Sequence, residues 1–518
     1  MNPAVLEKLK ALASETLYRQ LVSTEKSEDY AIEFLRLRIG KRREAYNEAK
    51  NISDYFAEIL AKKRAALSKN MKEVLKVGEM EAEVKDIVYS ISSNLSVNFL
   101  RYSPYFLERD VYNICSIVFN TETAIRMGYS VKNVVIEVSK ESYNMWDVKK
   151  IENELNELIK LVILVDVKIN IISKDTNKGR WKKKIKFSKY KGVCLFSGGV
   201  DSTTGLIYSL EKYKDTISSV FICHGDQGKV GNIIQKISRV IKRKYPLNLD
   251  VVHAPKMYSE GYSQLRGFLY VMYGAIFAKL RDAEQILITE CGPTMYQMRF
   301  SPFDSITMTT HPYVMSKTKK LIQLFFNKHI ELITPFEDLT KSEVAVLNPL
   351  PEIFPMSHSC IGARWIDSIQ HGNEDAKEDN DGTCYGCITR RLGLITAGIE
   401  DAKYENNPLL DPKAYADHLM NLLAFSTEVL LDYENIDDFS RENIDEFNKK
   451  DLFYRFALDN ICALYILIKE GKTLNHYIDN FYLDVVEELG EELFEKRIKE
   501  VRDKKYLPNF NKKVQIIT

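Results

Sequence analysis

The stretch at residues 195–202, which reads Leu-Phe-Ser-Gly-Gly-Val-Asp-Ser, most constrains how this chain can fold. Residues 193–196 are an apolar run that predicts a buried strand, and residues 203–210 have the apolar spacing of a helix. The glycines therefore fall at a turn between a strand and a helix. Such a turn is typical of an α/β protein with a parallel sheet.

The side chains of this turn suit it to phosphate binding. Gly198 and Gly199 permit a positive φ and a close approach of the backbone to a ligand. Backbone amides at the turn and at the following helix N-terminus can bind an anion, and serine hydroxyls add further donors. No Gly-Lys-Ser/Thr follows, so the turn is not a Walker A loop and suits pyrophosphate as a leaving group. We expect the ligand to contact Ser197, Gly198, Gly199, Val200, Asp201 and Ser202.

Strands and helices are expected to alternate from residue 191 onward, as in a doubly wound parallel sheet. The expected strands are residues 193–196, 220–223, 249–253, 286–289 and 331–334. Ligands in such sheets bind at the carboxyl ends of the strands. This rule brings His224 and Glu290 to the same edge as the glycine turn.

The flanking segments differ in character, and the sequence predicts four domains. Residues 1–85 have apolar positions at helical spacing, and residues 86–188 contain an expected strand–helix–strand unit at 131–138, 148–161 and 163–172. Residues 189–400 form the nucleotide-binding domain, and residues 401–518 are expected to be helical. The basic cluster at 178–189 is interpreted as a linker or an edge strand, with phosphate contact as the alternative.

The net charge and the hydrophobic content of the chain limit the kinds of partner that it can bind. The chain has 518 residues, 45% of them hydrophobic, and a net charge of +1. This balance argues against nucleic acid or an anionic membrane as a partner. No signal-peptide pattern and no membrane span are recognised, so a cytoplasmic protein is expected. Cys115, Cys194, Cys223 and Cys462 lie in apolar stretches and are expected to be buried free thiols.

A second cysteine group suggests a metal site. Cys384 and Cys387 form a Cys-x-x-Cys knuckle, and Cys360 lies upstream across a polar loop. Three thiolates suit Zn²⁺, which takes four ligands in a structural site. The fourth ligand is left open among Asp381, His358 and His371. A redox pair is the alternative interpretation of the knuckle.

The glycine turn resembles that of the PP-loop ATP pyrophosphatase superfamily. Further motifs narrow the resemblance to its QueC-like branch, the 7-cyano-7-deazaguanine synthases. These motifs are Arg-x-Phe-Leu at 266–269, Thr-Lys-x-Glu at 340–343, and Ser-Cys followed by the knuckle and its trailing arginines. The resemblance spans roughly residues 190–400 and leaves both flanks outside.

The resemblance implies a reaction. QueC-like enzymes adenylate the carboxylate of 7-carboxy-7-deazaguanine with ATP, form an amide with ammonia, and repeat the activation to reach the nitrile. It implies ATP, Mg²⁺ and Zn²⁺ as cofactors. Asp201 is then expected to orient the loop or the Mg²⁺, Lys341 to reach a phosphate, and Arg266 to pair with a phosphate or the substrate carboxylate. Lys341 can also be a first-turn helical residue behind a Thr340–Glu343 capping box, and Arg266 can be a surface ion pair.

The chain departs from the family pattern at three places. Asp381 stands where the family has a further cysteine. After the fourth strand come Glu290, Arg299 and a Thr-Thr-His-Pro run at 309–312, which resembles the QueC-like proteins of bacterial anti-phage systems, the Qat and type IV CBASS groups. In that branch the activated carboxylate is passed to a protein amino terminus. This implies a protein acceptor from the same defence operon, and the long flanks suit partner docking or a homodimer.

The remaining residues and functions are open at this stage. Glu290 could accept from a deazaguanine edge or a ribose hydroxyl, or cap a helix. His311, His224 and Arg299 are expected at the nucleotide or substrate, with His311 on a loop rather than an apolar face. The alternatives to the conjugating ligase are a housekeeping-type synthase and a nucleotide-binding interaction module without turnover.

Overall fold

The computed structural model describes most of the chain beyond residue 105. The described residues are 106–126, 131, 133–163, 165–174, 187–213, 217–224, 228–254, 264–296, 309–359, 381–411, 416–436, 441 and 444–505. The helical segment predicted for residues 1–85 and most of the basic cluster at 178–189 lie outside them.

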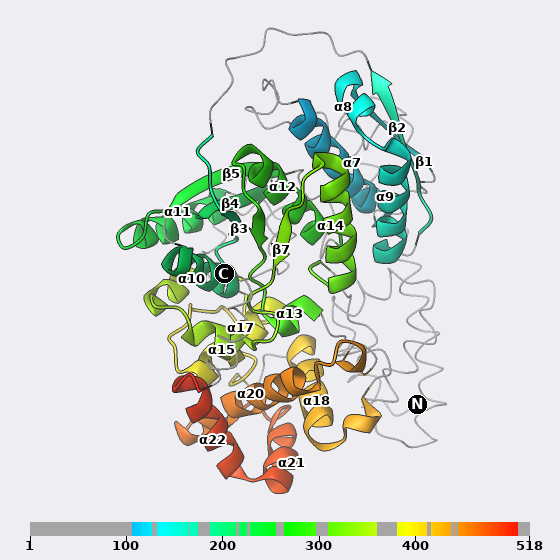
Figure 1. Cartoon of the computed structure of the whole chain (residues 1–518). Helices are drawn as coiled ribbons and strands as arrows, with labels where there is room; N and C mark the ends of the chain where they lie inside the picture. Colours follow the sequence, from blue (N-terminus) through cyan, green and yellow to red (C-terminus); the bar gives the residue numbers. More distant parts are fainter. Residues whose placement is uncertain are drawn as a thin grey trace, which may run out of the picture.

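A sheet of parallel strands forms the centre of the molecule, in the order β5-β4-β3-β6-β7 (Figure 1). Its strands are β3 (Gly192–Leu195), β4 (Ile217–His224), β5 (Asn248–Ala254), β6 (Gln285–Leu287) and β7 (Glu331–Ile333). All five predicted strands are present, and the doubly wound parallel α/β fold is confirmed.

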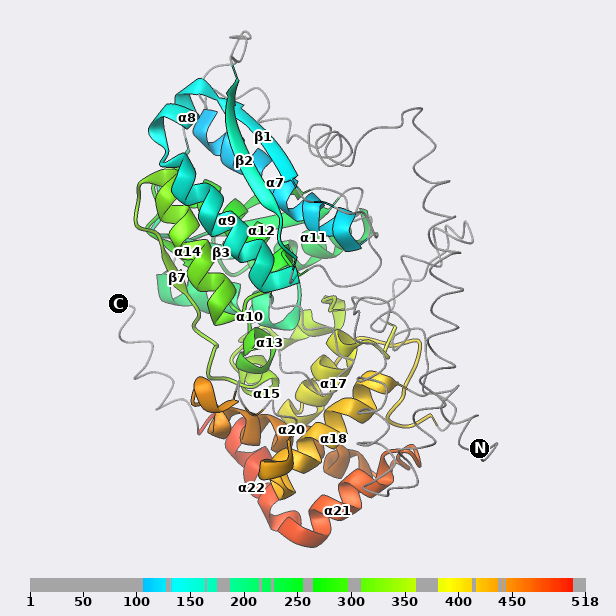
Figure 2. The same ribbon diagram turned by 90° about the vertical axis from the view of Figure 1, so that its right-hand side faces the viewer.

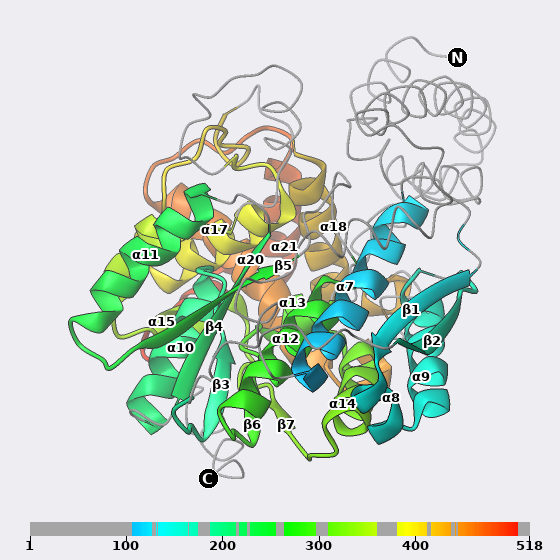
Figure 3. The same ribbon diagram turned by 90° about the horizontal axis from the view of Figure 1, so that it is seen from above.

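Helices cover both faces of this sheet (Figure 3). The helices around it are α10 (Val200–Tyr213), α11 (Gly228–Lys242), α12 (Arg266–Leu280), α13 (Gly292–Tyr296), α14 (Pro312–Phe326) and α15 (Lys341–Val346). Val193 packs in the cluster that contains α12 and α14, whereas its neighbour Cys194 packs in the cluster that contains α10 and α11. Consecutive strand residues point to opposite faces, so apolar residues at both positions are what a sheet buried on both sides requires.

A small two-stranded parallel sheet precedes the central one. It pairs β1 (Asn133–Ser139) with β2 (Lys168–Lys174), and α7 (Phe106–Arg126), α8 (Lys140–Met145) and α9 (Val148–Ile163) accompany it. The strand predicted at 163–172 begins only at residue 168. The reason is that α9 continues to Ile163, with Ile159 and Val162 buried at helical spacing.

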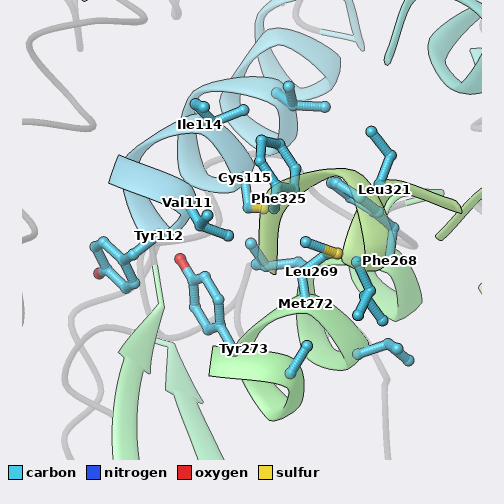
Figure 4. Close-up of a cluster of buried hydrophobic side chains, with 14 of the residues drawn as sticks. Val111, Tyr112, Ile114, Cys115, Phe268, Leu269, Met272, Tyr273, Leu321 and Phe325 are labelled. Atoms are coloured by element: carbon cyan, nitrogen blue, oxygen red, sulfur yellow. The ribbon is translucent and has the colours of Figure 1, made fainter. Parts of the chain in front are cut away.

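This unit shares its core with the central sheet. Figure 4 shows α7 packed against α12 and α14, with Cys115 among the buried side chains. Tyr112 and Tyr273 stack with ring centroids 4.8 Å apart, and Tyr273 Oη lies 2.6 Å from Ser116 Oγ. One hydrophobic cluster therefore runs through both units. The four-domain division stays a prediction.

The region beyond residue 400 is helical, as predicted, and packs below the sheet (Figure 2). Its elements are α18 (Asp417–Leu431), α20 (Lys450–Lys469), α21 (Asp479–Leu489) and α22 (Glu491–Arg502), with a short 3-10 turn at η3 (Tyr433–Asn435). Before it come the 3-10 turn η2 (Pro351–Met356) and helix α17 (Tyr385–Ala397). Cys462 is a buried free thiol here, as are Cys115 and Cys194 elsewhere, which confirms those expectations. The side chain of Cys223 lies outside the described residues.

Candidate functional site

The glycine turn lies at the carboxyl end of β3, where the strand order reverses between β4 and β6. Gly198 has a φ of +79°, a conformation that side chains other than glycine rarely adopt. The Thr203 amide donates to the Gly199 carbonyl at 3.0 Å and starts the hydrogen bonding of α10. The turn and the first amides of α10 thus face the place where open α/β sheets bind ligands.

Two serine hydroxyls stand together at this turn. Ser197 Oγ lies 2.9 Å from Ser202 Oγ, and the Ser197 amide donates to Ser202 Oγ at 3.2 Å. On the other side of the loop, the His358 amide donates to the Gly198 carbonyl at 3.3 Å. These contacts fix the positions of the two hydroxyls, and Ser197 is exposed at the surface of the turn.

A buried ion pair lies behind the turn. Lys341 Nζ donates to Asp201 Oδ2 at 2.5 Å, and the Cys291 amide reaches the same oxygen at 3.3 Å. Burial disfavours the charged ammonium, but Asp201 outweighs this and raises the pKa of Lys341. Within the described part of the chain, the other oxygen of this carboxylate, Oδ1, is buried and has no hydrogen-bond partner.

The local structure around Lys341 explains how it reaches Asp201. Thr340 is the N-cap of α15, and Thr340 and Glu343 form the predicted capping box. Gly393 of α17 lies against the Lys341 side chain: a Cβ there would come within 2.7 Å of Lys341 Cγ. The lysine chain therefore runs between its own helix and α17 to the loop.

Glu290 follows β6 and belongs to the same electrostatic group. Burial, and then the nearby Asp201 carboxylate, raise the pKa of Glu290, while Lys341 and Arg266 act in the opposite direction. Arg266 is the first residue of α12 and is half-buried. The structure thus gathers the predicted residues Asp201, Glu290, Lys341 and Arg266 around one end of the sheet.

The Thr-Thr-His-Pro run lies beside the N-terminus of α12. A Cβ on Gly267 would stand 1.7 Å from the Thr309 carbonyl oxygen, so the two backbones are in direct contact. His311 is the N-cap of α14, and its Nδ1 accepts from the Tyr313 amide at 3.4 Å. Its ring is 2% exposed and packs near Phe447 and Tyr313, with centroids 5.3 and 5.1 Å away. His311 therefore precedes the helix, on a loop as expected, but its ring is buried against Phe447, which is remote in sequence.

Other predicted residues are only partly within the described chain. His224 ends β4 at the expected edge of the sheet, and nothing is described of its side chain. Arg299, Cys360 and His371 lie outside the described residues. Their assignment to the site stays a prediction.

The cysteine knuckle opens helix α17. Cys384 is the N-cap residue, and Cys387 is fully buried. Asp381 Oδ2 accepts from the amides of Thr383 at 2.9 Å and of Cys384 at 3.2 Å, so this carboxylate holds the turn that leads into the helix. Among the described residues, which do not include Cys360, no group of three or more potential metal ligands is present.

Sequence reasoning missed the role of Arg390. Its guanidinium is 1% exposed and donates to the carbonyls of Phe354 at 2.6 Å and Ser357 at 2.8 Å, while Nη2 lies 2.6 Å from Asp401 Oδ1. It thereby ties the knuckle helix to the segment whose next residue, His358, contacts the glycine turn. The available signal was the arginine pair at 390–391, which lies between apolar residues of the same helix.

A doubly wound parallel sheet with this glycine turn at its switch point defines an α/β protein of the PP-loop type. No protein-family model matches the chain. A 7-cyano-7-deazaguanine synthase of Leptospira interrogans is 23% identical over 255 residues, which cover 44% of this chain and 96% of the relative. A 7-cyano-7-deazaguanine synthase of Pyrococcus furiosus is 22% identical over 240 residues, 41% of this chain and 95% of the relative. These distant relatives support the interpretation that the chain is related to the QueC-like PP-loop family.

The structure also bears on the expectation that the chain has no membrane-spanning helix. No helix in the described ranges is long and apolar enough to cross a membrane.

Proposed function

We propose that this chain is an ATP-dependent ligase that adenylates the carboxylate of 7-carboxy-7-deazaguanine and then forms an amide with an amine. Pyrophosphate leaves in the first step, and AMP leaves when the amine attacks the acyl-adenylate. The observation that carries the proposal is the PP-loop at the switch point, with Asp201 and Lys341 paired behind it at 2.5 Å. The names of the distant relatives supply the deazaguanine substrate.

The residues of the loop have a direct part in the first step. Attack on the α-phosphorus places charge on its oxygens and on the departing pyrophosphate. The loop amides, the hydroxyls of Ser197 and Ser202, and the Lys341 ammonium can stabilise that charge without reorganisation. Lys341 acts here as a point charge.

A magnesium ion fits the donors present. Asp201 Oδ1 is a buried carboxylate oxygen without a protein partner among the described residues, which is the kind of hard ligand that Mg²⁺ takes together with substrate phosphates. Bound there, the ion would neutralise phosphate charge.

Substrate recognition is assigned to the other members of the group. Arg266 can pair bidentately with a phosphate or the substrate carboxylate. Glu290, with its raised pKa, can hydrogen-bond a deazaguanine edge or a ribose hydroxyl. Arg299, His224 and His311 complete the proposed set.

Zinc is proposed at the knuckle as a structural ion. Cys384 and Cys387 lie one helical turn apart and are buried, and Cys360 would supply a third thiolate. The fourth ligand is Asp381, His358 or His371. Asp381 already accepts two amide hydrogen bonds through Oδ2.

Two candidate functions differ in which amine attacks the acyl-adenylate. The Thr-Thr-His-Pro run at 309–312 favours conjugation to the amino terminus of a protein from the same anti-phage operon, with a homodimer as a further use of the flanks. The relatives' name favours the second candidate, a synthase that uses ammonia and proceeds to the nitrile.

A single assay tests the proposal. Purified protein is incubated with Mg²⁺, ATP, 7-carboxy-7-deazaguanine and ammonia, and mass spectrometry follows AMP, the amide and the nitrile. AMP without nitrile supports the conjugating ligase, and nitrile supports the synthase. Bound nucleotide with no AMP would overturn both and leave a binding module.

A further inference from the structure

Helices α20 and α22 belong to the C-terminal extension, beyond the residues 190–400 that carry the QueC-like motifs. They nevertheless make buried polar contacts with the N-terminus of α15, the helix of Lys341. We propose that Asp459, Arg455 and Arg497 position Lys341 against Asp201, so that the extension is part of the catalytic apparatus. The proposal rests on the function proposed above for Lys341.

Asp459 of α20 binds the residues on either side of Lys341. Its Oδ2 accepts from Thr340 Oγ1 at 2.6 Å and from Ser342 Oγ at 2.5 Å. Thr340 and Ser342 are completely buried, and Asp459 is 2% exposed. One carboxylate oxygen thus fixes both neighbours of the lysine.

Two arginines complete the network. Arg497 of α22 donates from Nε to Asp459 Oδ1 at 2.8 Å and from Nη2 to Glu343 Oε1 at 2.7 Å. Arg455 of α20 donates from Nη1 to Glu343 Oε2 at 2.5 Å and from Nη2 to the Asp338 carbonyl at 2.9 Å. Burial disfavours the Glu343 carboxylate, but Arg455 and Arg497 outweigh this and lower its pKa. Two carboxylates and two guanidinium groups therefore match one another; Asp459, Glu343 and Arg497 are buried, and Arg455 is partly exposed.

The short length of α15 makes this network decisive for Lys341. The helix has six residues, too few to be stable without tertiary contacts. Glu343 also accepts from the Thr340 amide at 2.9 Å, so the arginines that hold Glu343 hold the capping box as well. If α15 shifts, the Lys341 ammonium is no longer aligned with the phosphate it stabilises. Small misplacements of such a group lower the reaction rate steeply.

The test compares the full-length variants Asp459→Asn, Arg455→Met and Arg455→Lys. Asn keeps the shape of Asp459 but removes its charge, and Lys keeps the charge of Arg455. The matched control is Lys469→Met, which breaks a surface pair between α20 and α22, Lys469 to Glu491 at 3.0 Å, away from α15. Circular dichroism selects the variants that fold.

Two readouts are measured. We expect kcat for AMP release to fall about 10-fold or more in Asp459→Asn and Arg455→Met, with a smaller change in KM for ATP, and to recover in Arg455→Lys. We also expect acetic anhydride to label Lys341 several-fold faster in the impaired variants, as read by peptide mass spectrometry. Folded Asp459→Asn and Arg455→Met proteins with wild-type labelling and wild-type kcat would overturn the proposal. If the wild type releases no AMP, the proposed function fails, and the labelling comparison still decides whether the network positions Lys341.

Discussion

At the scale of single residues, the site is dominated by two acidic side chains beside one lysine. Asp201 has Lys341 as its partner at 2.5 Å, whereas Glu290 lies near both and has a raised pKa. Perturbed carboxyl groups of this kind cluster at functional sites, where they reduce stability in return for chemistry.

Glu290→Gln should therefore stabilise the protein in a pH-dependent way. The Glu290 pKa is raised in the folded state, chiefly by burial and then by Asp201, so the folded state loses stability as the pH rises from the ordinary glutamate pKa of about 4.3 through the folded value. Glutamine does not ionise, so the variant does not lose this stability as the pH rises. We expect its gain in melting temperature to be largest at pH 8 and to shrink toward pH 4, as measured by calorimetry. A gain that is constant with pH would contradict the assignment.

Ser202→Ala tests the loop itself. Removing this hydroxyl should lower the rate of AMP release by about 10-fold or more, because a donor to the departing phosphates is lost, while the fold is kept. Ser209→Ala is the control, since Ser209 lies further along the same helix and its hydroxyl donates to the Gly205 carbonyl at 2.6 Å. Equal rates in the two variants would remove Ser202 from the site.

At the scale of elements, close backbone contacts set where the loops of the site lie. Gly267→Ala would place a methyl group 1.7 Å from the Thr309 carbonyl, and backbone cannot yield as a flexible side chain can. We expect this variant to lose stability strongly or to displace the 309–312 segment. Gly274→Ala on the same helix meets side chains instead, Leu195 Cδ2 at 2.9 Å and Ile286 Cγ2 at 3.5 Å, and should be tolerated better. Thermal melting of both variants measures the difference, and similar losses would refute the close contact.

The elements themselves were largely predictable from the sequence. The strands of the central sheet are short apolar runs, and the capping box at Thr340 is a local pattern, so both could be recognised without tertiary information. The start of β2 was misplaced because Ile163 fits a helix and a strand equally well. Local patterns of this kind specify an element better than its limits.

The surroundings of the site were much less predictable. Phe447 covers His311 and Asp459 binds Thr340 from more than a hundred residues away in the sequence. Neither partner carries a local signal, because a phenylalanine in a turn and an aspartate on a helix each have many possible roles. Asp459 reaches the site because α20 packs close to α15, and Phe447 reaches it because the turn before α20 packs against α13 and the start of α14.

At the scale of the whole molecule, the shared core predicts cooperative unfolding of the small sheet and the central one. Ile114 of α7 is completely buried in the cluster that also contains α12 and α14. Ile114→Ala should cost about 2–5 kcal/mol and lower the melting temperature of the nucleotide-binding unit with it. Ile172→Ala on β2, where the side chain is 43% exposed, is the control. Two separate calorimetric transitions, with only one of them shifted, would show that the units unfold independently.

The pairing of Asp201 with Lys341 has a consequence for how a polyphosphate is attracted. Lys341, the cation behind the loop, is already matched by a carboxylate of the same chain, and the chain as a whole is close to neutral. The pull on an incoming anion then comes mostly from oriented backbone amides, whose field falls off over a short distance. Nucleotide capture by this protein should consequently resist added salt far better than the binding of a nucleic acid to a basic surface does.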